Sequence, residues 1–435
     1  MFFEATSYFK KWYNQRMLDP KFILKNPELV KEGCKKKGEE EGLVDEFLKW
    51  EKKRRKVLKE VEGLRKEQNE MSKQIAISKK KEFLEKAKEI KKELEKKEKV
   101  LKNLEKKTKE ILSQIPNLPL PDVPEGKDDS QNVVVKVWGK IPQFDFKVKD
   151  HLEIGEKLDL IDVKRAAKTS GSRFGFLKNE LVLLELALLQ FATEEIQKEN
   201  FQLILPPVLI KPELFWGMGY LEKGREDIYF LEKDNLFLVG TAEQILGPMH
   251  ANEIFKEKEL PKRYLAFSAC FRREAGSWGK DTRGIFRVHQ FDKLEMFSFC
   301  QPEASVKEHD FFLSLEERLV QKLKLPYRVV KVCSGEMAFP TARQFDIEIW
   351  FPGQGRWRET HSTSNCTDFQ ARRLNIRYFN EKTKKLEFVH TVNGTAFAMG
   401  RMICAILENY QKKDGSVLVP EVLKKYLPFD KIPCR

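Results

Sequence analysis

The stretch ACFRREAGSWGKDTRGIFRVHQF, residues 269–291, holds side chains whose types and spacing suit a nucleotide. Arg272 and Arg287 flank a charged, glycine-containing segment, and Phe291 closes the stretch. Planar guanidinium groups pair well with phosphate, and an aromatic ring can stack on a purine. One arginine alone would more often be an ordinary surface residue. The three together predict a site for a polyphosphate joined to a purine.

A β-hairpin would bring these side chains to one surface. Cys270 to Glu274 predicts the end of a strand that presents Arg272 and Glu274 on one side. Residues 276–284, rich in Gly, Ser, Lys and Asp, predict a loop. Residues 285–291 predict the returning strand, because every second residue from Ile285 onward would lie on one face.

Three segments resemble the signature motifs of class II aminoacyl-tRNA synthetases. FRRE, a loop and then Arg-x-x-x-Phe, within residues 269–291, resemble motif 2. Pro207, within about residues 186–210, resembles the proline of motif 1, which in that family lies at a dimer interface. The triplet NGT followed by FAMGRM, within residues 393–411, resembles motif 3, with Arg401 as its arginine.

Further segments resemble one branch of these enzymes. They are Thr241-Ala242-Glu243, RETHS at residues 358–362, FQARR at residues 369–373 and a long basic hairpin near the N-terminus. On these features the chain, from Met17 onward, is identified as a member of the bacterial-type seryl-tRNA synthetases. The resemblance implies an α+β fold: an N-terminal antiparallel two-helix coiled-coil arm, and a class II catalytic domain on an antiparallel β-sheet flanked by helices.

The resemblance also implies how ATP, a substrate, is held. Arg272 would contact the α-phosphate and Arg287 the γ-phosphate, while Phe291 and Arg401 would cover the two faces of the adenine. The three arginines are the implied catalytic residues, since phosphoryl chemistry needs charge compensation more than a protein nucleophile. The residues assigned to ATP in this way are Arg272, Arg273, Glu274, Arg287, Val288, Phe291, Glu359, Thr360, His361, Ser362 and Arg401.

Glu359 and Ser362 are the implied metal ligands. Carboxylate and hydroxyl oxygens suit Mg²⁺, which would bind them together with the phosphates. The histidines predict no metal site, because His250, His289 and His390 lie far apart and have no ligand spacing. We expect them, with His361, to be structural or to support their neighbours.

The amino-acid pocket needs an acidic group for the ammonium and polar groups for the hydroxyl. The resemblance assigns L-serine to Thr241, Ala242, Glu243, Arg272, Glu295 and Thr395. A pocket that hydrogen-bonds a hydroxyl rejects alanine strongly, because its own polar groups are otherwise left unpaired. Threonine would be excluded only by lack of room for a methyl group, which is a weaker filter.

The charge balance predicts a polyanionic partner. The chain of 435 residues carries a net charge of +14, and residues 49–110 hold 24 Lys and Arg against 13 Asp and Glu. A localised basic excess is typical of nucleic-acid binding, although a solvated helical face would look similar. Seven scattered cysteines without a CxxC pair favour reduced thiols and a cytoplasmic location. No apolar run is long enough to span a membrane, and residues 1–16 predict an N-terminal extension ahead of a more natural start at Met17.

The clearest periodicity in the chain is a pair of matched heptad seams. A short polar segment, residues 76–82, separates them, so they predict an antiparallel helical hairpin over about residues 43–115, each arm about 50 Å long. The seam positions are Leu43, Phe47, Trp50, Arg54, Val57, Val61, Leu64, Gln68, Met71 and Ile75, then Phe83, Ala87, Ile90, Leu94, Lys97, Leu101, Leu104, Thr108, Ile111 and Ile115.

The domains predicted are an extension (1–16), a tRNA-binding domain (17–115) and a catalytic domain (116–435) that begins with a proline-rich linker. One helix is expected before the arm, at residues 26–37. FQLILPPVLI at residues 201–210 predicts a buried strand that its prolines confine to a sheet edge or a subunit interface. Further strands are predicted at 133–139, 228–231, 236–239, 264–271, 294–300, 328–333 and 344–351, and helices at 178–197, 241–254, 302–322, 364–375 and 395–412.

The function implied is serine–tRNA ligase: activation of L-serine with ATP, then transfer to the 3′ end of tRNA(Ser) and, by family habit, tRNA(Sec), by a homodimer without a membrane partner. A class II synthetase for another amino acid, such as threonine or proline, is the nearest alternative. A paralogue that charges a carrier protein would not need the basic hairpin. A non-catalytic RNA-binding coiled-coil protein would not need the ATP residues.

Overall fold

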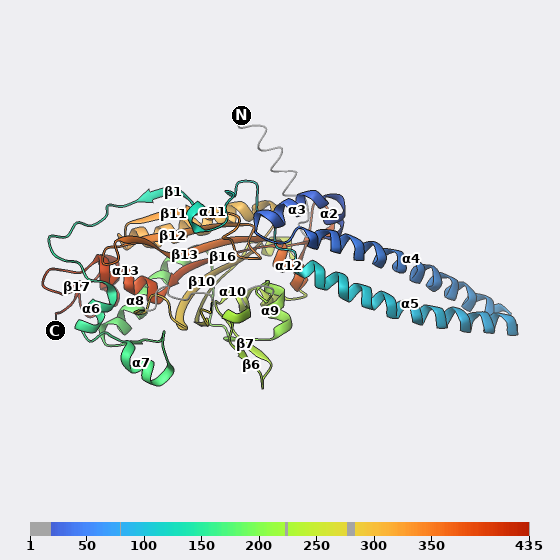
Figure 1. Ribbon diagram of the computed structural model, residues 1–435, viewed down its shortest axis with the longest axis horizontal. Helices are drawn as coiled ribbons and strands as arrows, with labels where there is room; N and C mark the ends of the chain where they lie inside the picture. The colour runs from blue at the N-terminus through green and yellow to red at the C-terminus, as the bar shows by residue number, and fades with distance from the viewer. Residues whose placement is uncertain (1–18, 79, 222–224, 276–282, 435) are drawn as a thin grey trace, which may run out of the picture. The chain divides into compact units, whose positions relative to one another are not determined.

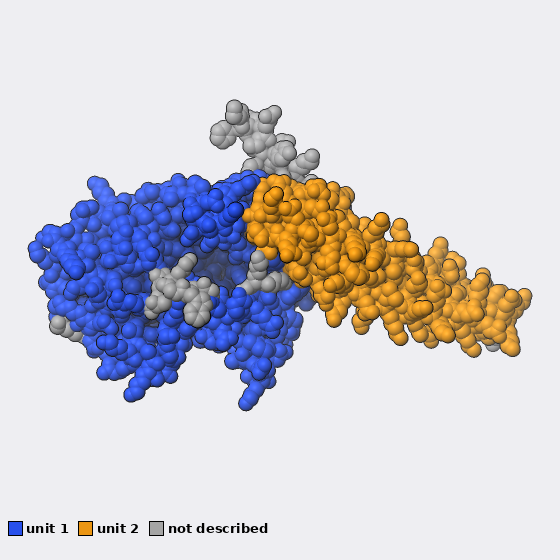
Figure 2. All heavy atoms as spheres, in the orientation of Figure 1, with its two compact units in different colours: residues 1–15, 119–435 blue, residues 16–118 orange. Residues whose placement is uncertain are grey.

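The computed structural model describes residues 19–78, 80–221, 225–275 and 283–434. The chain divides into two compact units, residues 16–118 and a larger unit that contains residues 119–435 (Figure 2). The predicted extension, residues 1–16, lies outside the described residues, as does most of the predicted loop 276–284. No helix in the described ranges is both long and apolar enough to cross a membrane.

The smaller unit is helical. It consists of α2 (Pro20–Lys25), α3 (Pro27–Lys36), α4 (Gly42–Ile77) and α5 (Lys81–Ser113). The helix predicted at residues 26–37 is confirmed as α3, but α2, which precedes it, was not predicted. Asp19 caps α2 by accepting from the Lys21 amide at 2.8 Å, and Asn26, with φ −135°, separates α2 from α3. Proline begins both helices at a position where its missing N–H costs nothing.

Helices α4 and α5 form the antiparallel hairpin that the heptad seams predicted (Figure 1). Val61, Leu94 and Leu101 form a buried cluster between the helices, as expected of seam positions. Two ion pairs cross from one helix to the other: Lys97 Nζ lies 2.5 Å from Glu60, and Arg65 lies 2.7 Å from Glu98. The predicted coiled-coil arm is therefore confirmed.

An eight-stranded sheet forms the centre of the larger unit, in the order β1-β11-β12-β13-β16-β10-β9-β4. All neighbours are antiparallel except β4 and β9, so the predicted α+β class is confirmed. The strands are β1 (Val133–Trp138), β4 (Gln202–Ile204), β9 (Lys262–Phe271), β10 (Gln290–Cys300), β11 (Tyr327–Lys331), β12 (Arg343–Phe351), β13 (Arg356–Thr367) and β16 (His390–Ala398).

Helices cover both faces of this sheet. Helices α8 (Glu180–Gln197), α11 (Ser305–Lys322) and α13 (Met399–Asn409) pack into the main core cluster. The short helices α9 (Pro212–Met218), α10 (Glu243–Leu246) and α12 (Phe369–Leu374) contribute to a second cluster. Leu265 of β9 belongs to the main cluster and its neighbours Tyr264 and Ala266 to the second, so the clusters lie on opposite faces.

Two strand predictions were wrong in part. The predicted strand 201–210 is two short strands, β4 at the sheet edge and β5 (Leu209–Ile210) in a separate three-stranded sheet. It is not buried in this chain, because Leu205 between them is 81% exposed. The returning strand of the motif 2 hairpin begins at Gln290, and residues 285–289 are irregular.

Three helix predictions placed the ends wrongly. Residues 364–367 continue strand β13 and residues 395–398 continue β16, so α12 and α13 begin later than predicted. The predicted helix 241–254 is only α10 followed by one 3₁₀ turn, Pro248–His250. Neighbouring strands pair with Ser364, Asn365, Thr367 and Thr395, because sheet context outweighs local propensity there.

Candidate active site

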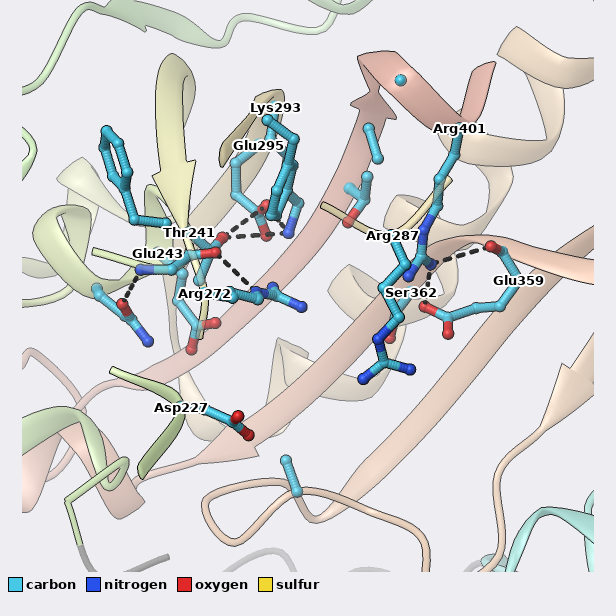
Figure 3. Close-up of a pocket in the computed structure, with 18 of the residues that line it drawn as sticks. Asp227, Thr241, Glu243, Arg272, Arg287, Lys293, Glu295, Glu359, Ser362 and Arg401 are labelled. Carbon is cyan, nitrogen blue, oxygen red and sulfur yellow. Dashed lines mark hydrogen bonds and ion pairs between the residues drawn. The ribbon is translucent and has the colours of Figure 1, made fainter. Parts of the chain in front are cut away.

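A cavity of about 390 Å³ opens on the face of the sheet that also carries the second core cluster. Phe291, Lys293 and Glu295 of β10 point into it at period two, and β9, β12, β13, β16 and α13 supply other walls. Figure 3 shows two groups of charged side chains in this cavity. We call Thr241, Glu243, Lys293, Glu295 and Thr395 the acidic end, and Arg287, Glu359, Ser362 and Arg401 the arginine end.

Strand pairing assembles much of the acidic end. Glu295 pairs across the sheet with Thr395, next to a β-bulge. The Lys293 ammonium forms an ion pair with Glu295 and lies 3.1 Å from Thr241 Oγ1, which donates to Glu295 at 3.0 Å. Burial raises the pKa of Glu295, and Lys293 acts in the opposite direction. This arrangement keeps a carboxylate and a hydroxyl fixed side by side.

Glu243 is the second carboxylate of the acidic end and is only 3% exposed. Its two oxygens accept hydrogen bonds from different donors, Tyr220 Oη at 2.8 Å and Gln370 Nε2 at 2.8 Å. Burial and the nearby charge of Glu295 raise the pKa of Glu243 to about 7. The group can therefore change its charge near neutral pH.

Arg272 is held beside the acidic end by the chain around it. Its Nε donates to the Gly240 carbonyl at 3.1 Å, and its guanidinium lies 5.3 Å from the Phe291 ring centroid. Its own carbonyl contacts His289 Nδ1 at 2.9 Å, which ties the two sides of the motif 2 hairpin together. Arg272 and Phe291 therefore lie close together, as the predicted convergence of these residues on one surface requires.

A β-bulge explains the arginine end. Ile347 of β12 pairs with His361 of β13, but the next residue, Glu348, pairs with Glu359, so Thr360 is an extra residue. In a regular strand, residues 359 and 362 would face opposite sides. The bulge shifts the alternation by one residue, so Glu359 and Ser362 both line the cavity.

Arg401 closes this end of the cavity. It lies 3.0 Å from the Glu359 carboxylate, and its guanidinium lies 5.0 Å from the centroid of Phe286. Partial desolvation would raise the pKa of Glu359, whose side chain is 48% exposed, but Arg401 and Arg272 lower it below its ordinary value. Arg287 forms an ion pair with Glu274, whose backbone has φ +54°. The arginine end therefore keeps the Glu359 carboxylate ionised.

The side chains of the arginine end supply only some of the oxygen ligands that a hard cation needs. Glu359 and Ser362 offer a carboxylate and a hydroxyl on one wall, both of the type that Mg²⁺ prefers. Among the described residues no group of three or more His, Cys, Asp or Glu side chains could hold a metal. A magnesium ion here would need further oxygens, such as those of a polyphosphate.

Comparisons with known proteins decide the family. The family model described as the seryl-tRNA synthetase N-terminal domain matches residues 17–119, and that of the class II core domain (G, H, P, S and T) matches residues 229–410. A serine–tRNA ligase of Dictyoglomus thermophilum is 46% identical over 96% of this chain and 99% of its own. The chain belongs to the seryl-tRNA synthetase family.

Solved structures agree with this assignment. The seryl-tRNA synthetase of Pyrococcus horikoshii complexed with ATP superposes with a TM-score of 0.90 at 43% identity, covering 96% of this chain and 99% of that one. The cytoplasmic serine–tRNA ligase of Naegleria fowleri in complex with AMP gives 0.87 at 31% identity, covering 97% and 100%. The class II synthetase prediction and the coiled-coil arm are thereby confirmed.

The structure brings most of the family's expected site residues to one cavity. Those that line it are Thr241, Glu243, Arg272, Glu274, Arg287, Val288, Phe291, Glu295, Glu359, Thr360, Ser362, Thr395 and Arg401. Three expected residues do not line it. Ala242 packs into the second core cluster, Arg273 lies over the Tyr229 ring at 5.4 Å, and His361 is 1% exposed and contacts Thr360 Oγ1 at 2.8 Å.

Sequence reasoning missed several polar groups of the site. Lys293 could have been found, because it alternates with Phe291 and Glu295 along one strand. Tyr220 and Gln370 touch Glu243 from distant segments, and no spacing in the sequence indicates this. The family motif FQARR contains Gln370, but its sequence gives no role for it.

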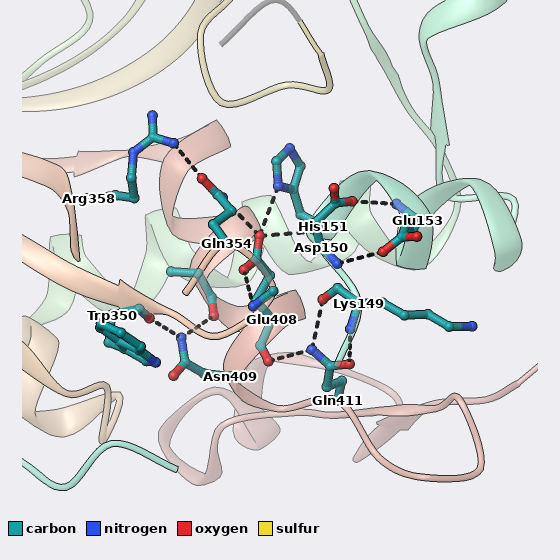
Figure 4. A network of polar contacts seen from close by, with 12 residues as sticks. Lys149, Asp150, His151, Glu153, Trp350, Gln354, Arg358, Glu408, Asn409 and Gln411 are labelled. Carbon is teal, nitrogen blue, oxygen red and sulfur yellow. Dashed lines mark hydrogen bonds and ion pairs between the residues drawn. The ribbon is translucent and has the colours of Figure 1, made fainter. Parts of the chain in front are cut away.

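A buried polar network lies behind the arginine end (Figure 4). The Glu408 carboxylate of α13 accepts from the His151 amide at 3.1 Å, the Gly353 amide at 2.9 Å and Gln354 Nε2 at 3.0 Å, and it contacts His151 Nδ1 at 3.0 Å. Gln354 accepts from Arg358, whose guanidinium lies 3.8 Å from the Phe286 centroid. The network therefore supports the ring on which Arg401 rests.

The same network reaches the end of motif 2. A Cβ at Gly284, which has φ +76°, would lie 2.3 Å from His151 Nε2. Only glycine leaves room for the imidazole at this position. His151, the first residue of α6 (His151–Lys157), thus packs directly against the chain that leads into Phe286 and Arg287.

Proposed function

We propose that this protein is a serine–tRNA ligase, which activates L-serine with ATP and transfers it to the 3′ end of tRNA(Ser). One observation carries the proposal: a buried carboxylate and hydroxyl pair, Glu295 and Thr241, lies in the same cavity as the motif 2 and motif 3 arginines. Family membership and the ATP and AMP complexes of the similar structures support it.

In the first step a serine carboxylate oxygen attacks the α-phosphorus of ATP, and the bond from that phosphorus to the bridging oxygen of pyrophosphate breaks. Arg272 is proposed to neutralise charge on the α-phosphate, and Arg287 and Arg401 to neutralise charge on the leaving pyrophosphate. Phe291 and Arg401 would enclose the adenine. These groups need only hold charge in place, because no protein nucleophile is required.

In the second step the terminal hydroxyl of the tRNA attacks the carbonyl carbon of seryl-adenylate, and AMP leaves. The acidic end is proposed to hold the amino acid through both steps. Glu243 would attract the serine ammonium, while Glu295 and Thr395 would hydrogen-bond its hydroxyl. Alanine would leave these buried polar groups unpaired, so the pocket would discriminate strongly against it.

Mg²⁺ is proposed to accompany ATP, bound by Glu359 and Ser362. The bulge in β13 that turns both residues into the cavity supports this. The ion would neutralise phosphate charge when bound. Isothermal titration of ATP with and without Mg²⁺, on the protein and on Glu359→Gln, tests the assignment; equal Mg²⁺ dependence in both would contradict it.

The basic arm is proposed to bind the long extra arm of tRNA(Ser), and of tRNA(Sec) where that tRNA exists. Residues 49–110 hold 24 Lys and Arg against 13 Asp and Glu, and this positive excess supports contacts to phosphates. The affinity for tRNA should therefore fall steeply as the salt concentration rises. Deleting residues 49–110 should abolish tRNA charging but leave serine activation intact. Charging that survives the deletion would contradict this role.

The protein is proposed to act as a cytoplasmic homodimer. Apolar residues gather on α8 and around β4, with Leu186 57%, Leu203 45% and Leu205 81% exposed. Such a surface at a sheet edge is typical of a subunit interface. Light scattering on the purified protein checks the mass of the assembly, and cell fractionation checks its location.

The test of the proposed function is ATP–pyrophosphate exchange with each of the twenty amino acids and no tRNA. Exchange with serine alone is the expected result. Exchange with threonine or proline instead would keep the site but overturn its specificity. No exchange at all would favour the non-catalytic or carrier-charging alternatives.

A further inference from the structure

We infer that Gln370 and Tyr220 are positioning residues for Glu243, and that the FQARR segment serves to place Gln370 at this carboxylate. The inference rests on the proposed function, since it assigns a task to the pocket that would bind serine. It concerns two residues that do not themselves carry charge.

The contacts account for both oxygens of Glu243. Tyr220 Oη donates to Oε2 at 2.8 Å, and Gln370 Nε2 donates to Oε1 at 2.8 Å. With one oxygen held from each side, the carboxylate cannot rotate without losing one of its two charge-assisted hydrogen bonds. Its remaining lone pairs are left for a ligand.

The orientation of Gln370 is itself fixed. Its side chain is fully buried, and its carbonyl oxygen accepts from Thr391 Oγ1 at 2.6 Å. An amide that accepts on one side must present its NH₂ group on the other, here to Glu243. Thr391 belongs to β16, the strand that also carries Thr395.

The rest of the FQARR segment joins α12 to α9. The Arg373 guanidinium lies 4.2 Å from the Phe369 ring centroid and 4.9 Å from that of Trp216, and it donates to the Trp216 carbonyl at 3.2 Å. A Cβ at Gly217 would lie 2.3 Å from Leu374, so the two helices are in close contact. Tyr220 is the second residue after the end of α9, so the packing of α12 against α9 places both donors.

Neutral donors suit a carboxylate that must attract an ammonium group. An arginine or lysine bound to Glu243 would cancel its charge, whereas an amide and a phenol leave it intact. The charged groups that face Glu243 are Glu295 and Lys293 of β10, and these pair with each other. The Cys366 thiol is near enough to Tyr220 to act on it electrostatically. Glu243 is thus the carboxylate of the acidic end that has no cationic partner of its own.

The test compares Tyr220→Phe and Gln370→Met in serine-dependent pyrophosphate exchange. Tyr220→Phe removes one donor, Gln370→Met removes one donor together with the acceptor of Thr391, and both variants keep the approximate shape of the side chain. We expect KM for serine to rise about tenfold in each, the effect of one hydrogen bond to a charged group, while KM for ATP stays within about twofold. Since the donors favour the ionised form, their loss should also move the acidic limb of kcat/KM for serine to higher pH.

Matched controls are Tyr264→Phe and Gln321→Met. Tyr264 hydrogen-bonds His250 at 2.7 Å and Gln321 hydrogen-bonds Tyr327 at 2.7 Å, both outside the cavity. We expect the controls to keep both KM values and the pH profile. Thermal unfolding of all four variants separates folding defects from binding defects.

Three results would overturn the inference: an unchanged KM for serine, an unmoved acidic limb, or an equal rise in KM for serine and ATP. Tyr220→Phe alone can decide, if Gln370→Met fails to fold. Failure of the proposed function looks different, because the unaltered protein would then show no serine-dependent exchange.

Discussion

The charged side chains at the two ends of the cavity differ in how far they are exposed to water. At the acidic end the Glu295 side chain is 1% exposed and that of Lys293 11%, whereas at the arginine end the Glu359 side chain is 48% exposed and that of Arg287 33%. Charges in a buried setting interact strongly, and exposed charges are screened by water. Activity should therefore depend strongly on each individual contact at the acidic end. At the arginine end several cations share the neutralisation of phosphate charge, so each single cation should contribute less.

The largest effect is expected at the buried ion pair. Glu295→Gln leaves Lys293 without a counter-charge, and breaking a buried pair in this way costs about 3–5 kcal/mol. We expect kcat/KM for serine in pyrophosphate exchange to fall at least about 100-fold. The control is Glu348→Gln, which removes the partner of Arg328 outside the cavity and should change activity less than about twofold. Similar losses of kcat/KM for serine in Glu295→Gln and Glu348→Gln would contradict the special importance of the buried ion pair.

A smaller effect, on ATP and not on serine, is expected at the arginine end. Arg401→Met removes one charge-assisted contact to Glu359 and the contact with Phe286. We expect kcat/KM for ATP to fall about 10- to 100-fold, with KM for serine nearly unchanged. Arg165→Met, which breaks an exposed pair with Asp162, is the control. A matching rise in KM for serine would show that the two ends are not separable.

The pH dependence should also separate the two ends. Burial and Glu295 raise the pKa of Glu243 to about 7, so acidification protonates it and removes the charge that attracts the ammonium. We expect kcat/KM for serine to fall about tenfold for each pH unit below this pKa. KM for ATP should not follow, because the pKa of Glu359 is lowered and its carboxylate stays ionised. Parallel pH profiles for the two substrates would contradict the comparison.

The smallest effect is expected from the network behind the arginine end. Glu408→Gln keeps the side-chain shape but replaces one acceptor oxygen by a donor, which cannot satisfy the donors of Gly353, Gln354 and His151 together. We expect a rise of a few-fold in KM for ATP, since Arg358 and Phe286 lose support, and a lower Tm. KM for serine should stay constant. A rise in KM for serine alone would contradict the assignment of this network to the arginine end.

The sequence predicted most residues of both ends of the cavity, but not the neutral groups that support the acidic end. Arginines and an aromatic ring in one short stretch indicated nucleotide chemistry at Arg272, Arg287 and Phe291. The other residues of both ends, except Lys293, were expected only from the family resemblance. The acidic end depends on neutral donors such as Tyr220 and Gln370, which come from segments far apart in the chain. A glutamine or tyrosine gives no signal of its own in a sequence, because both types occur in many settings.

Local irregularities limited the prediction of strands. Simple alternation would separate Glu359 from Ser362, and only the bulge at Thr360 turns both into the cavity. A bulge depends on the partner strand, so one strand's sequence does not specify it. The arm was easier to predict, because the seven-residue repeat that defines it lies entirely within its own two helices.

The arm has a consequence for how this family can vary. Its layers are contributed by positions that face one another across α4 and α5, and the cluster of Val61, Leu94 and Leu101 covers two successive layers, because Leu94 and Leu101 are one heptad apart on α5. Removing seven residues from both helices at matched positions would shorten the hairpin by about 10 Å and leave every remaining layer with its partner. The length of the arm can thus change in steps of one heptad, by paired insertions or deletions in α4 and α5, while the sequence of the catalytic unit stays the same.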